Sequence, residues 1–558
     1  MKRRFVFLSI LLIAISLSIS AQTDRNFWFV APDITKDYGT GGGYQGGEPV
    51  YFVFTSYDLP TTITIDQPAN GGFTPIVINL GANTTYYQDM TGYIRPVNVT
   101  ENRPPNTTLN YGYKITSTEL ITAYYEVANT DNSEIFSLKG DNALGTSFIV
   151  PFQNKYENAG TIGPDSAYSS FEIVATAPGT NVTITPSQDI VGHAAGVPFP
   201  VALGEGQTYS AVAVNRGAGG HLGGSIITSD NDIAVTFKDD AVHSDTSAAS
   251  CIDLNGDQLI PVSIIGTEYV AYRGLVNVTD PMSDPPDTAG TGEWVFIVAT
   301  QNGTDVFVNG QPIADTTIDA GGIFAFQLVG DNTHFRTSNP AYAYHLTGMG
   351  CQYSGAVLPP IDVCTGSISV RFNRSPAPNG TPVFLLTIIA RQGTENDFTL
   401  NPGGIPISGT AFQPISGTTD WVIGQFDLTA EVPLNTAMTL SNSEDVFHVS
   451  ITNGTRAGGV RHAYFSDYDE LTIEAQIGGS GSDSLGLCFG DRVRLEASGG
   501  FEYNWYPTED LSNPEIANPW AYPSDTTTYS CEVIGACDLT DTVGVTIYVS
   551  DRVEADYT

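Results

Sequence analysis

Basic residues are scarce in this 558-residue chain, and their scarcity argues against two classes of partner. Lysine and arginine together number 22 against 60 aspartates and glutamates, so the formal net charge is −38 at pH 7. A surface of that sign repels the phosphate backbone of nucleic acids and the headgroups of anionic lipids. We therefore expect neither a nucleic acid nor an anionic membrane as a partner.

Long apolar runs are missing after the first twenty residues. The one such run, residues 5–19, follows Lys2-Arg3-Arg4 and precedes Ser20-Ala21. A basic start, a short apolar stretch and a small-residue cleavage site are typical of a signal peptide, here residues 1–21. Because a spanning helix needs about 20 apolar residues, we expect no membrane insertion after cleavage. The protein is predicted to be exported, either extracellular or on the outer cell surface.

The sequence lacks the common catalytic signatures. It contains no HExxH, GxSxG, CxxC or phosphate-binding GK[ST] motif. Residues 41–46 match GxGxxG in form, but another β-type run follows where a dinucleotide site requires a helix. The seven histidines show no repeated spacing. We predict that the protein is not an enzyme.

Cysteine is limited to six positions, and in an exported chain these indicate structural disulfides rather than metal binding. Cys351 and Cys364 flank one strand-and-turn segment and form a candidate pair. Cys488 has two candidate partners, Cys531 and Cys537. Spacing alone does not choose among the pairings, and Cys251 is left open.

The chain is rich in glycine (58 residues) and contains one pattern four times. An apolar strand, a short turn and an alternating strand are followed by a glycine-bearing segment and a closing strand led by serine. The copies begin near Tyr51, Phe171, Trp294 and Val383. Repetition on this scale predicts a tandem array of one small structural unit.

Within the repeats the polarity alternates with a period of two. Thr62–Ile65, Val182–Thr185 and Asp305–Val308 have one apolar and one polar face, as half-buried strands do. Val295–Ala299 is apolar on both faces and suits a central strand. The predicted fold class is all-β: four related β-sandwich repeats followed by an immunoglobulin-like or PKD-like β-sandwich. Whether the repeats form four sandwiches or pair into two stays open.

The composition and the glycine-bearing joints divide the chain into eight parts. They are a signal peptide (1–21), an opening segment with repeat one (22–152), repeat two (153–274), repeat three (275–372), repeat four (373–477), a glycine-serine linker (478–483), a small separate domain (484–550) and the start of a possible further module (551–558).

The densest group of carboxylates lies in residues 238–257. Asp253, Asn255 and Asp257 have the 1-3-5 spacing with which a loop wraps oxygen atoms around Ca²⁺, so they are candidate calcium ligands. Ile264 stands where an EF-hand needs its glutamate, so the site would not be an EF-hand. The alternatives are a polar loop between strands and, less favoured, the carboxylate pair of a glycosidase.

Paired tyrosines recur at equivalent places in the repeats, at Tyr124-Tyr125 and at Tyr342 with Tyr344. Exposed tyrosines would offer a platform for sugar rings or proteins. At alternating strand positions they are more often part of the core or of cross-strand pairs, and we favour that interpretation.

Across residues 25–470 the chain resembles the N-terminal domain family of IgGFc-binding proteins. The resemblance rests on Arg25–Phe29, on the run Gly256–Gly274, and on Gly355–Pro360 with Cys364-Thr365-Gly366. It implies an extracellular, β-rich recognition region of the kind found in surface proteins of Bacteroidetes. It does not assign an Fc contact to any residue.

Residues 484–550 resemble PKD and immunoglobulin-like modules. The matching residues are Tyr503–Pro507, Asn513-Pro514, Asn518-Pro519 and Thr526–Tyr529. In the immunoglobulin pattern the first cysteine falls nearer position 497 than 488. This comparison favours pairing Cys488 with Cys537.

These observations predict a secreted or cell-surface adhesion and recognition protein. The β-repeats would act as a rod that presents loops or strand edges to a protein or a glycan, such as mucin or the surface of a neighbouring cell. The alternatives are a structural stalk of a larger surface protein and, less favoured, a glycan-acting hydrolase. No cofactor is expected other than the Ca²⁺ considered above.

Overall fold

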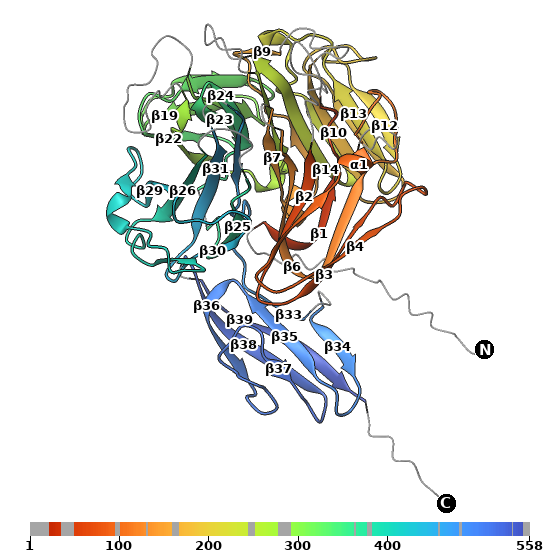
Figure 1. The fold of residues 1–558 in the computed structure, drawn as a ribbon, viewed down its shortest axis with the longest axis vertical. Coiled ribbons are helices and arrows are strands. Elements are labelled where there is room, and N and C mark those ends of the chain that lie inside the picture. Colours follow the sequence, from red (N-terminus) through yellow and green to blue (C-terminus); the bar gives the residue numbers. More distant parts are fainter. Residues whose placement is uncertain are drawn as a thin grey trace, which may run out of the picture. The chain divides into compact units, whose positions relative to one another are not determined.

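The computed structural model describes residues 22–34, 49–94, 101–129, 132–158, 167–243, 252–276, 292–361, 364–376, 382–455, 458–478, 482–537 and 539–550. The predicted signal peptide, the glycine loop at 41–46, Cys251 and residues 551–558 lie outside this part of the chain. Two compact units are present, one ending at Leu471 and one beginning at Thr472. Both are built of strands, which confirms the all-β fold class (Figure 1).

Repeat one forms a seven-stranded sheet around one long strand, β6. Strands β1, β2, β3 and β7 all pair with β6, while β4 extends β3 and β5 extends β2. A single helical turn, α1 (Thr91–Ile94), follows β5. The strands are β1 (Thr23–Phe29), β2 (Val50–Ser56), β3 (Thr61–Asp66), β4 (Ile76–Leu80), β5 (Thr85–Asp89), β6 (Tyr113–Val127) and β7 (Glu134–Leu138).

Repeat two has the same pairing scheme around the long strand β14. Strands β8, β10, β11 and β15 pair with β14, and β12 and β13 extend β11 and β10. The short strand β9 is an addition to the scheme. The strands are β8 (Gly145–Ile149), β9 (Glu157–Asn158), β10 (Ser169–Ala175), β11 (Thr180–Thr185), β12 (Phe199–Leu203), β13 (Thr208–Val212), β14 (Ile226–His243) and β15 (Ile252–Gln258).

Repeats three and four divide the long strand in two. In repeat three the break falls at Pro340, which has no backbone N–H to give to a sheet. The strands of repeat three are β16 (Glu268–Tyr272), β17 (Leu275–Val276), β18 (Trp294–Ala299), β19 (Thr304–Val308), β20 (Thr316–Ile318), β21 (Ile323–Gln327), β22 (Asn332–Thr337), β23 (Ala341–Gly350) and β24 (Gln352–Val357).

Repeat four follows repeat three with two exceptions: its short strand β28 joins β29 instead of β27, and none of its described strands takes the place of β17, which pairs in parallel with β23. Its strands are β25 (Ser369–Asn373), β26 (Val383–Arg391), β27 (Phe398–Asn401), β28 (Gln413–Pro414), β29 (Trp421–Asp427), β30 (Ala437–Asn442), β31 (Phe447–Gly454) and β32 (Val460–Tyr464). Short 3-10 helices lie at η1 (Gly140–Ala143), η2 (Ala218–Gly220), η3 (Val262–Ile264) and η4 (Gly409–Ala411).

Each of the four repeats therefore completes its own set of strands, so there are four related units rather than two. The strand at each predicted joint belongs to the repeat that follows it: β8 pairs with β14, β16 with β22 and β25 with β30. These pairings join strands far apart in the sequence, and the order of motifs along the chain does not reveal them.

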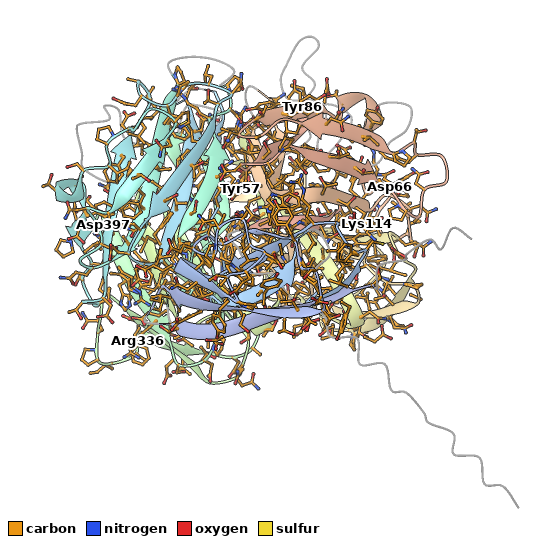
Figure 2. All side chains as sticks on the ribbon, turned by 90° about the horizontal axis from the view of Figure 1, so that it is seen from below. Tyr57, Asp66, Tyr86, Lys114, Arg336 and Asp397 are labelled. Carbon is orange, nitrogen blue, oxygen red and sulfur yellow. The ribbon has the colours of Figure 1, made fainter. Side chains whose placement is uncertain are left out.

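The repeats close into a ring and do not form the rod predicted from the sequence. The last strand of each repeat is almost wholly buried, and these four strands contact one another in the cycle β7, β15, β24, β32 and back to β7. Repeat four also packs directly on repeat one, where Arg371 lies 4.2 Å from the centre of the Tyr57 ring. In Figure 2 Tyr57 lies among crowded side chains, whereas Arg336 and Asp397 lie at the margin.

The second unit is a small β-sandwich of two sheets, β33-β35-β37 and β34-β39-β38-β36. Its core contains Trp505 and Tyr529, and Trp505 is the register partner of Cys531. Strand β33, assigned from the sequence to repeat four, pairs with β35 of this unit. The strands are β33 (Glu474–Ile477), β34 (Ser484–Leu487), β35 (Val493–Ser498), β36 (Gly500–Tyr506), β37 (Trp520–Ala521), β38 (Thr527–Gly535) and β39 (Thr540–Val549).

Candidate functional site

A recess of about 540 Å³ opens in repeat three, and we call it the repeat-three groove. It lies between the β19–β20 turn and strand β21 with the turn that follows it. Ile313 is 79% exposed and Val329 is 68% exposed. A contiguous patch of solvent-exposed apolar side chains indicates a binding surface more clearly than single exposed apolar residues do. The apolar lining residues are Val308, Ile313, Ala314, Phe324, Phe326 and Val329.

The wall formed by the β19–β20 turn is fixed by local chemistry. Asn309 and Gly310 both have positive φ, 55° and 67°, as in the tight Asn-Gly turn of a hairpin. The carboxylate of Asp315 accepts a 2.8 Å hydrogen bond from the backbone N–H of Val308. A Cβ atom added at Gly310 would lie 2.7 Å from the Cα of Gly417 in repeat four. The turn is therefore held from within and from the neighbouring repeat.

The floor of the groove is aromatic. Phe324 and Phe326 are two positions apart on β21 and so share one face of the strand, with ring centroids 6.3 Å apart. Phe326 also meets Phe335 of β22 edge-to-face at 5.2 Å. Because Phe335 is fully buried, the floor is anchored to the core of repeat three.

The outer edge of β21 differs from its counterparts in two other repeats. The equivalent edges of β13 in repeat two and β29 in repeat four are covered by other segments. In repeat two the N–H groups of Asn106 and Gly112 donate to Ser210 and Gly206, so a segment of repeat one covers β13 and the turn before it. In repeat four β28 covers β29. Within the described ranges no strand pairs with the outer edge of β21. An uncovered strand edge can accept a further strand from another chain.

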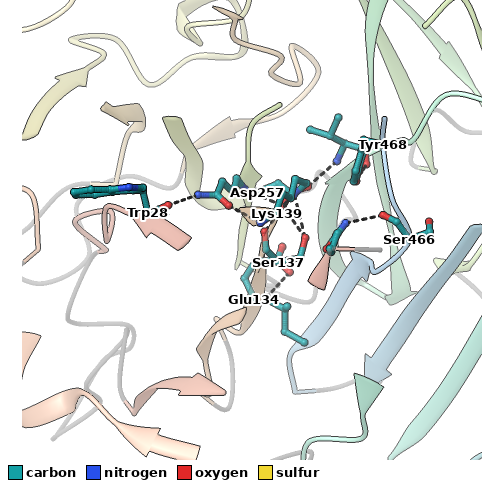
Figure 3. A network of polar contacts seen from close by, with 11 residues as sticks. Trp28, Glu134, Ser137, Lys139, Asp257, Ser466 and Tyr468 are labelled. Carbon is teal, nitrogen blue, oxygen red and sulfur yellow. Dashed lines mark hydrogen bonds and ion pairs between the residues drawn. The ribbon is translucent and has the colours of Figure 1, made fainter. Parts of the chain in front are cut away.

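The centre of the ring holds a polar network that is buried. The ammonium of Lys139 lies 2.5 Å from the carboxylate of Asp257 and 3.0 Å from the hydroxyl of Ser137 (Figure 3). The backbone N–H groups of Gln258 and Val357 also donate to Asp257, at 2.8 Å and 3.1 Å. This network joins repeats one, two and three, and its donors are already used within the protein.

Glu134, at the start of β7, is also enclosed in the ring. Its carboxyl accepts hydrogen bonds from the Ser354 hydroxyl at 2.6 Å and from the Gly355 N–H at 3.2 Å. Burial raises the pKa of Glu134 well above its usual range, although these hydrogen bonds oppose the shift. Burial raises the pKa of Asp257 too, with Lys139 acting in the opposite direction.

The predicted calcium loop is wrong in its geometry. Asp253, Asn255 and Asp257 lie on strand β15 instead of a loop, and all three are buried. Asp253 accepts the N–H of Tyr353 at 3.0 Å, and Asp257 is held by Lys139. A strand spaces alternate side chains along a line, so it does not wrap them around one ion. Among the described residues, no group of three or more His, Cys, Asp or Glu side chains is arranged to hold a metal.

The predicted Cys488–Cys537 disulfide is also wrong. Cys488 is an exposed free thiol and Cys531 a buried one, whereas Cys537 is disulfide-bonded. Burial raises the pKa of Cys531 to about 11. Cys351 and Cys364 are both disulfide-bonded, and their pairing with each other stays a prediction. The immunoglobulin pattern is kept in its tryptophan, because Trp505 is buried against Cys531, but not in its disulfide.

The paired tyrosines belong to the core, as we favoured. Tyr124, Tyr125, Tyr342 and Tyr344 are each at most 1% exposed, so none offers a platform to a ligand. The repeat-three groove was not predicted. Its one signal in the sequence is Asn309-Gly310, which marks a hairpin turn but not the exposed Ile313 beyond it. In the part of the chain with described structure, no helix is long and apolar enough to cross a membrane.

Comparison with known proteins identifies the family. The family model described as IgGFc binding protein matches residues 136–454, more than half of the chain. No curated protein matches. Similar solved structures include the human desmocollin-1 ectodomain, 9% identical over 89% of this chain and 94% of that chain, with a TM-score of 0.12.

Two further structures are equally distant. The N-terminal eight immunoglobulin domains of Down syndrome cell adhesion molecule are 9% identical over 96% of this chain and 74% of theirs, with a TM-score of 0.11. Invasin, a bacterial integrin-binding protein, is 11% identical over 73% and 79%, with a TM-score of 0.11. Scores this low support no argument about function. The family match decides the assignment, and this chain belongs to the IgGFc binding protein family.

Proposed function

We propose that this chain is an exported recognition protein whose four-repeat ring binds a protein ligand at the repeat-three groove. The observation that carries the proposal is the groove itself: an aromatic floor, two strongly exposed apolar residues, and an edge of β21 with which no described strand pairs. Such a surface suits an extended or loop segment of a partner, which can bury apolar side chains and add backbone hydrogen bonds to β21. Membership of a family named for binding IgG Fc supports a protein ligand.

Export is supported by the disulfide-bonded Cys351, Cys364 and Cys537, because disulfides persist in oxidising compartments. We also propose that the second unit serves as a PKD-like or immunoglobulin-like spacer and that the origin of the chain lies among Bacteroidetes-type surface proteins. The proposed role is binding and not catalysis.

The alternative of a structural stalk receives less support from the fold. A stalk gains length when its repeats stack end to end, whereas the four repeats of this chain close on themselves through β7, β15, β24 and β32. In a ring the repeats form one compact body, and loops and strand edges are exposed around it. That arrangement suits presentation of a binding surface better than separation of two distant points.

The groove is tested by binding of the whole exported chain to immobilised IgG Fc, mucin and other extracellular glycoproteins. We expect saturable binding to one of these proteins, weakened at least tenfold by Ile313→Asp and by Val329→Asp, because each places a charge in the apolar contact. Val77→Asp is the matched control, since Val77 is 60% exposed but lies in repeat one. Equal binding by all three variants, or a folded protein that binds no protein ligand, would contradict the proposal.

A further inference from the structure

The contact between Lys139 and Asp257 at the centre of the ring is short and enclosed (Figure 3). Nζ of Lys139 lies 2.5 Å from Oδ1 of Asp257, whereas charged N–H···O pairs usually meet at about 2.7–2.9 Å. The two side chains are 0% and 1% exposed, so bulk water does not reach them. A contact this short also brings Nζ within reach of the carboxyl carbon Cγ, as attack by an amine requires.

The amine and the carboxyl are held together from separate strands. Lys139 directly follows β7, and its backbone N–H donates to Oε1 of Gln258 at 2.8 Å. Asp257 lies on β15, and the N–H of Val357 on β24 donates to its Oδ2 at 3.1 Å. The centre of the Tyr468 ring lies 5.4 Å from Nζ. The two reacting groups therefore stay in contact for as long as the ring is folded.

Burial favours the neutral forms of both groups. It lowers the pKa of Lys139, with Asp257 acting in the opposite direction, and it raises the pKa of Asp257, with Lys139 acting in the opposite direction. Both shifts favour passage of a proton from the ammonium to the carboxylate. The result is a neutral amine beside a carboxylic acid, and a neutral amine has the free electron pair that a nucleophile needs.

Ser137 provides a carrier for the protons of a condensation. Nζ of Lys139 donates to the Ser137 hydroxyl at 3.0 Å, and this hydroxyl donates to Oδ1 of Asp257 at 3.4 Å. An amine, a carboxyl and a proton relay are thus enclosed together. We propose that Lys139 and Asp257 condense into an intramolecular amide bond, an isopeptide cross-link that joins repeat one to repeat two.

The reaction consumes nothing and releases one water molecule. The Nζ–Cγ bond forms and the Cγ–Oδ1 bond breaks, while the N–H of Val357 stabilises the negative charge that develops on Oδ2. One amine proton passes through the Ser137 hydroxyl to Oδ1, which leaves as water with that proton and the proton of the acid. The amide keeps one N–H for the backbone oxygen of Ser137, which Nζ contacts at 3.3 Å.

A second buried lysine, Lys238, lacks this arrangement. Its Nζ lies 3.4 Å from Oδ2 of Asp240, two positions further along the same strand. Burial acts to lower the pKa of Lys238, but Asp240, Asp33 and Glu172 together raise it above its usual value. Lys238 therefore stays an ammonium without a free electron pair, and we expect no cross-link there.

The cross-link is tested by peptide mapping of the whole exported chain after reduction and denaturation. Trypsin does not cleave after a lysine whose Nζ is in an amide. We therefore expect one branched peptide, in which residues 115–155 are joined to residues 239–273, lighter than the two segments together by one water molecule. Tandem mass spectrometry should place the junction at Lys139 and Asp257. The inference does not rest on the ligand proposed for the groove, because the test involves no ligand.

Two variants separate a covalent bond from an ion pair. Lys139→Arg keeps the positive charge but has no amine to condense, so it should lose the branched peptide and gain the mass of one water beyond the substitution itself. Lys114→Arg, which changes a partly exposed lysine of repeat one, should keep the branched peptide. Circular dichroism equal to that of the wild type shows that Lys139→Arg is folded.

Recovery of residues 115–139 and 239–273 as separate peptides from the wild type would overturn the inference, whatever the variants do. So would a mass deficit of one water that persists in Lys139→Arg, or a branched peptide whose junction lies at other residues.

Discussion

At the scale of single residues, buried acids set the response of this protein to pH. Burial raises the pKa of Glu172 to about 7, although Lys238 and the hydroxyls of Ser170 and Ser210 act against the shift. Burial likewise raises the pKa of Asp24 to about 7 and that of Asp467 to about 6. In each case the folded state binds a proton more tightly than the unfolded chain does, so the protein loses stability as these groups ionise.

Glu172→Gln should therefore stabilise the protein more at neutral than at acidic pH. The contribution of protonated Glu172 is fully present below the ordinary pKa of 4.5 and is lost as pH rises to about 7. A shift of this size corresponds to about 3 kcal/mol. Denaturant unfolding at pH 5 and pH 8 measures the difference, and the variant should gain on the wild type by up to that amount. A gap that stays constant with pH would show that Glu172 is ionised throughout.

Which polar residues are buried could be predicted only in part. The alternation of the strands predicts the core positions of Tyr124 and Tyr342 correctly. The spacing of Asp253, Asn255 and Asp257 is shared by a calcium loop and by one face of a strand, and no local signal separates the two. The partner that decides, Lys139, is more than one hundred positions away. The missing information is therefore tertiary.

At the scale of the strand, the close approach of neighbouring strands in the ring restricts which residues fit at certain positions. Gly355 of β24 faces Tyr344, and a Cβ atom at position 355 would overlap the tyrosine hydroxyl. Gly256 of β15 has a similar restriction, because its Cβ would overlap the backbone oxygen of Phe237. The glycines that carry the family resemblance thus have a packing role in the strands that close the ring.

Gly355→Ala should consequently destabilise the fold by roughly 1–3 kcal/mol, the usual cost of overpacking a filled core. Gly71→Ala is the matched control, since a Cβ at that position meets nothing within 4 Å. Equilibrium unfolding in guanidinium chloride compares the two. If Gly355→Ala were as stable as Gly71→Ala, the ring would have more freedom than its packing indicates.

The repeats themselves were predictable, because each strand carries its period in its own residues. The assignment of β8, β16 and β25 to the following repeat was not, since a strand of either repeat would show the same alternation. Nor does the sequence reveal that, among the described residues, no strand covers the outer edge of β21. That edge differs from β13 and β29 only in which other segments pair with it. The cover of β13 is a long-range pairing, because Asn106 lies about one hundred positions before Ser210, whereas Gln413 lies only ten positions before its partner Ile423.

At the scale of the whole molecule, closure changes how stability is shared. In a linear array each repeat contacts only its neighbours, and damage at one end stays local. Here Arg461 of repeat four pairs with Glu126 of repeat one at 2.9 Å, and both side chains are at most 2% exposed. The hydroxyl of Ser375 donates to the same carboxylate at 2.8 Å. The first and last repeats are thus joined by a buried ion pair.

Arg461→Met should weaken all four repeats together. Removing one partner of a buried pair leaves the other charge without compensation, at a cost of roughly 3–5 kcal/mol. Calorimetry of the whole chain should show two transitions, one for the ring and one for the second unit, and Arg461→Met should lower only that of the ring. Trp505→Ala is the reciprocal control, because Trp505 is buried in the core of the second unit.

Hydrogen exchange then distinguishes a closed ring from a chain of independent repeats. If the ring is one cooperative body, Arg461→Met should speed exchange in β10 and β18 of repeats two and three as much as in β26 of repeat four. Strands β10 and β18 lie in repeats two and three, which the ion pair does not join, so a local effect would not reach them. Faster exchange confined to repeats one and four would mean that the repeats touch in a ring but fold separately.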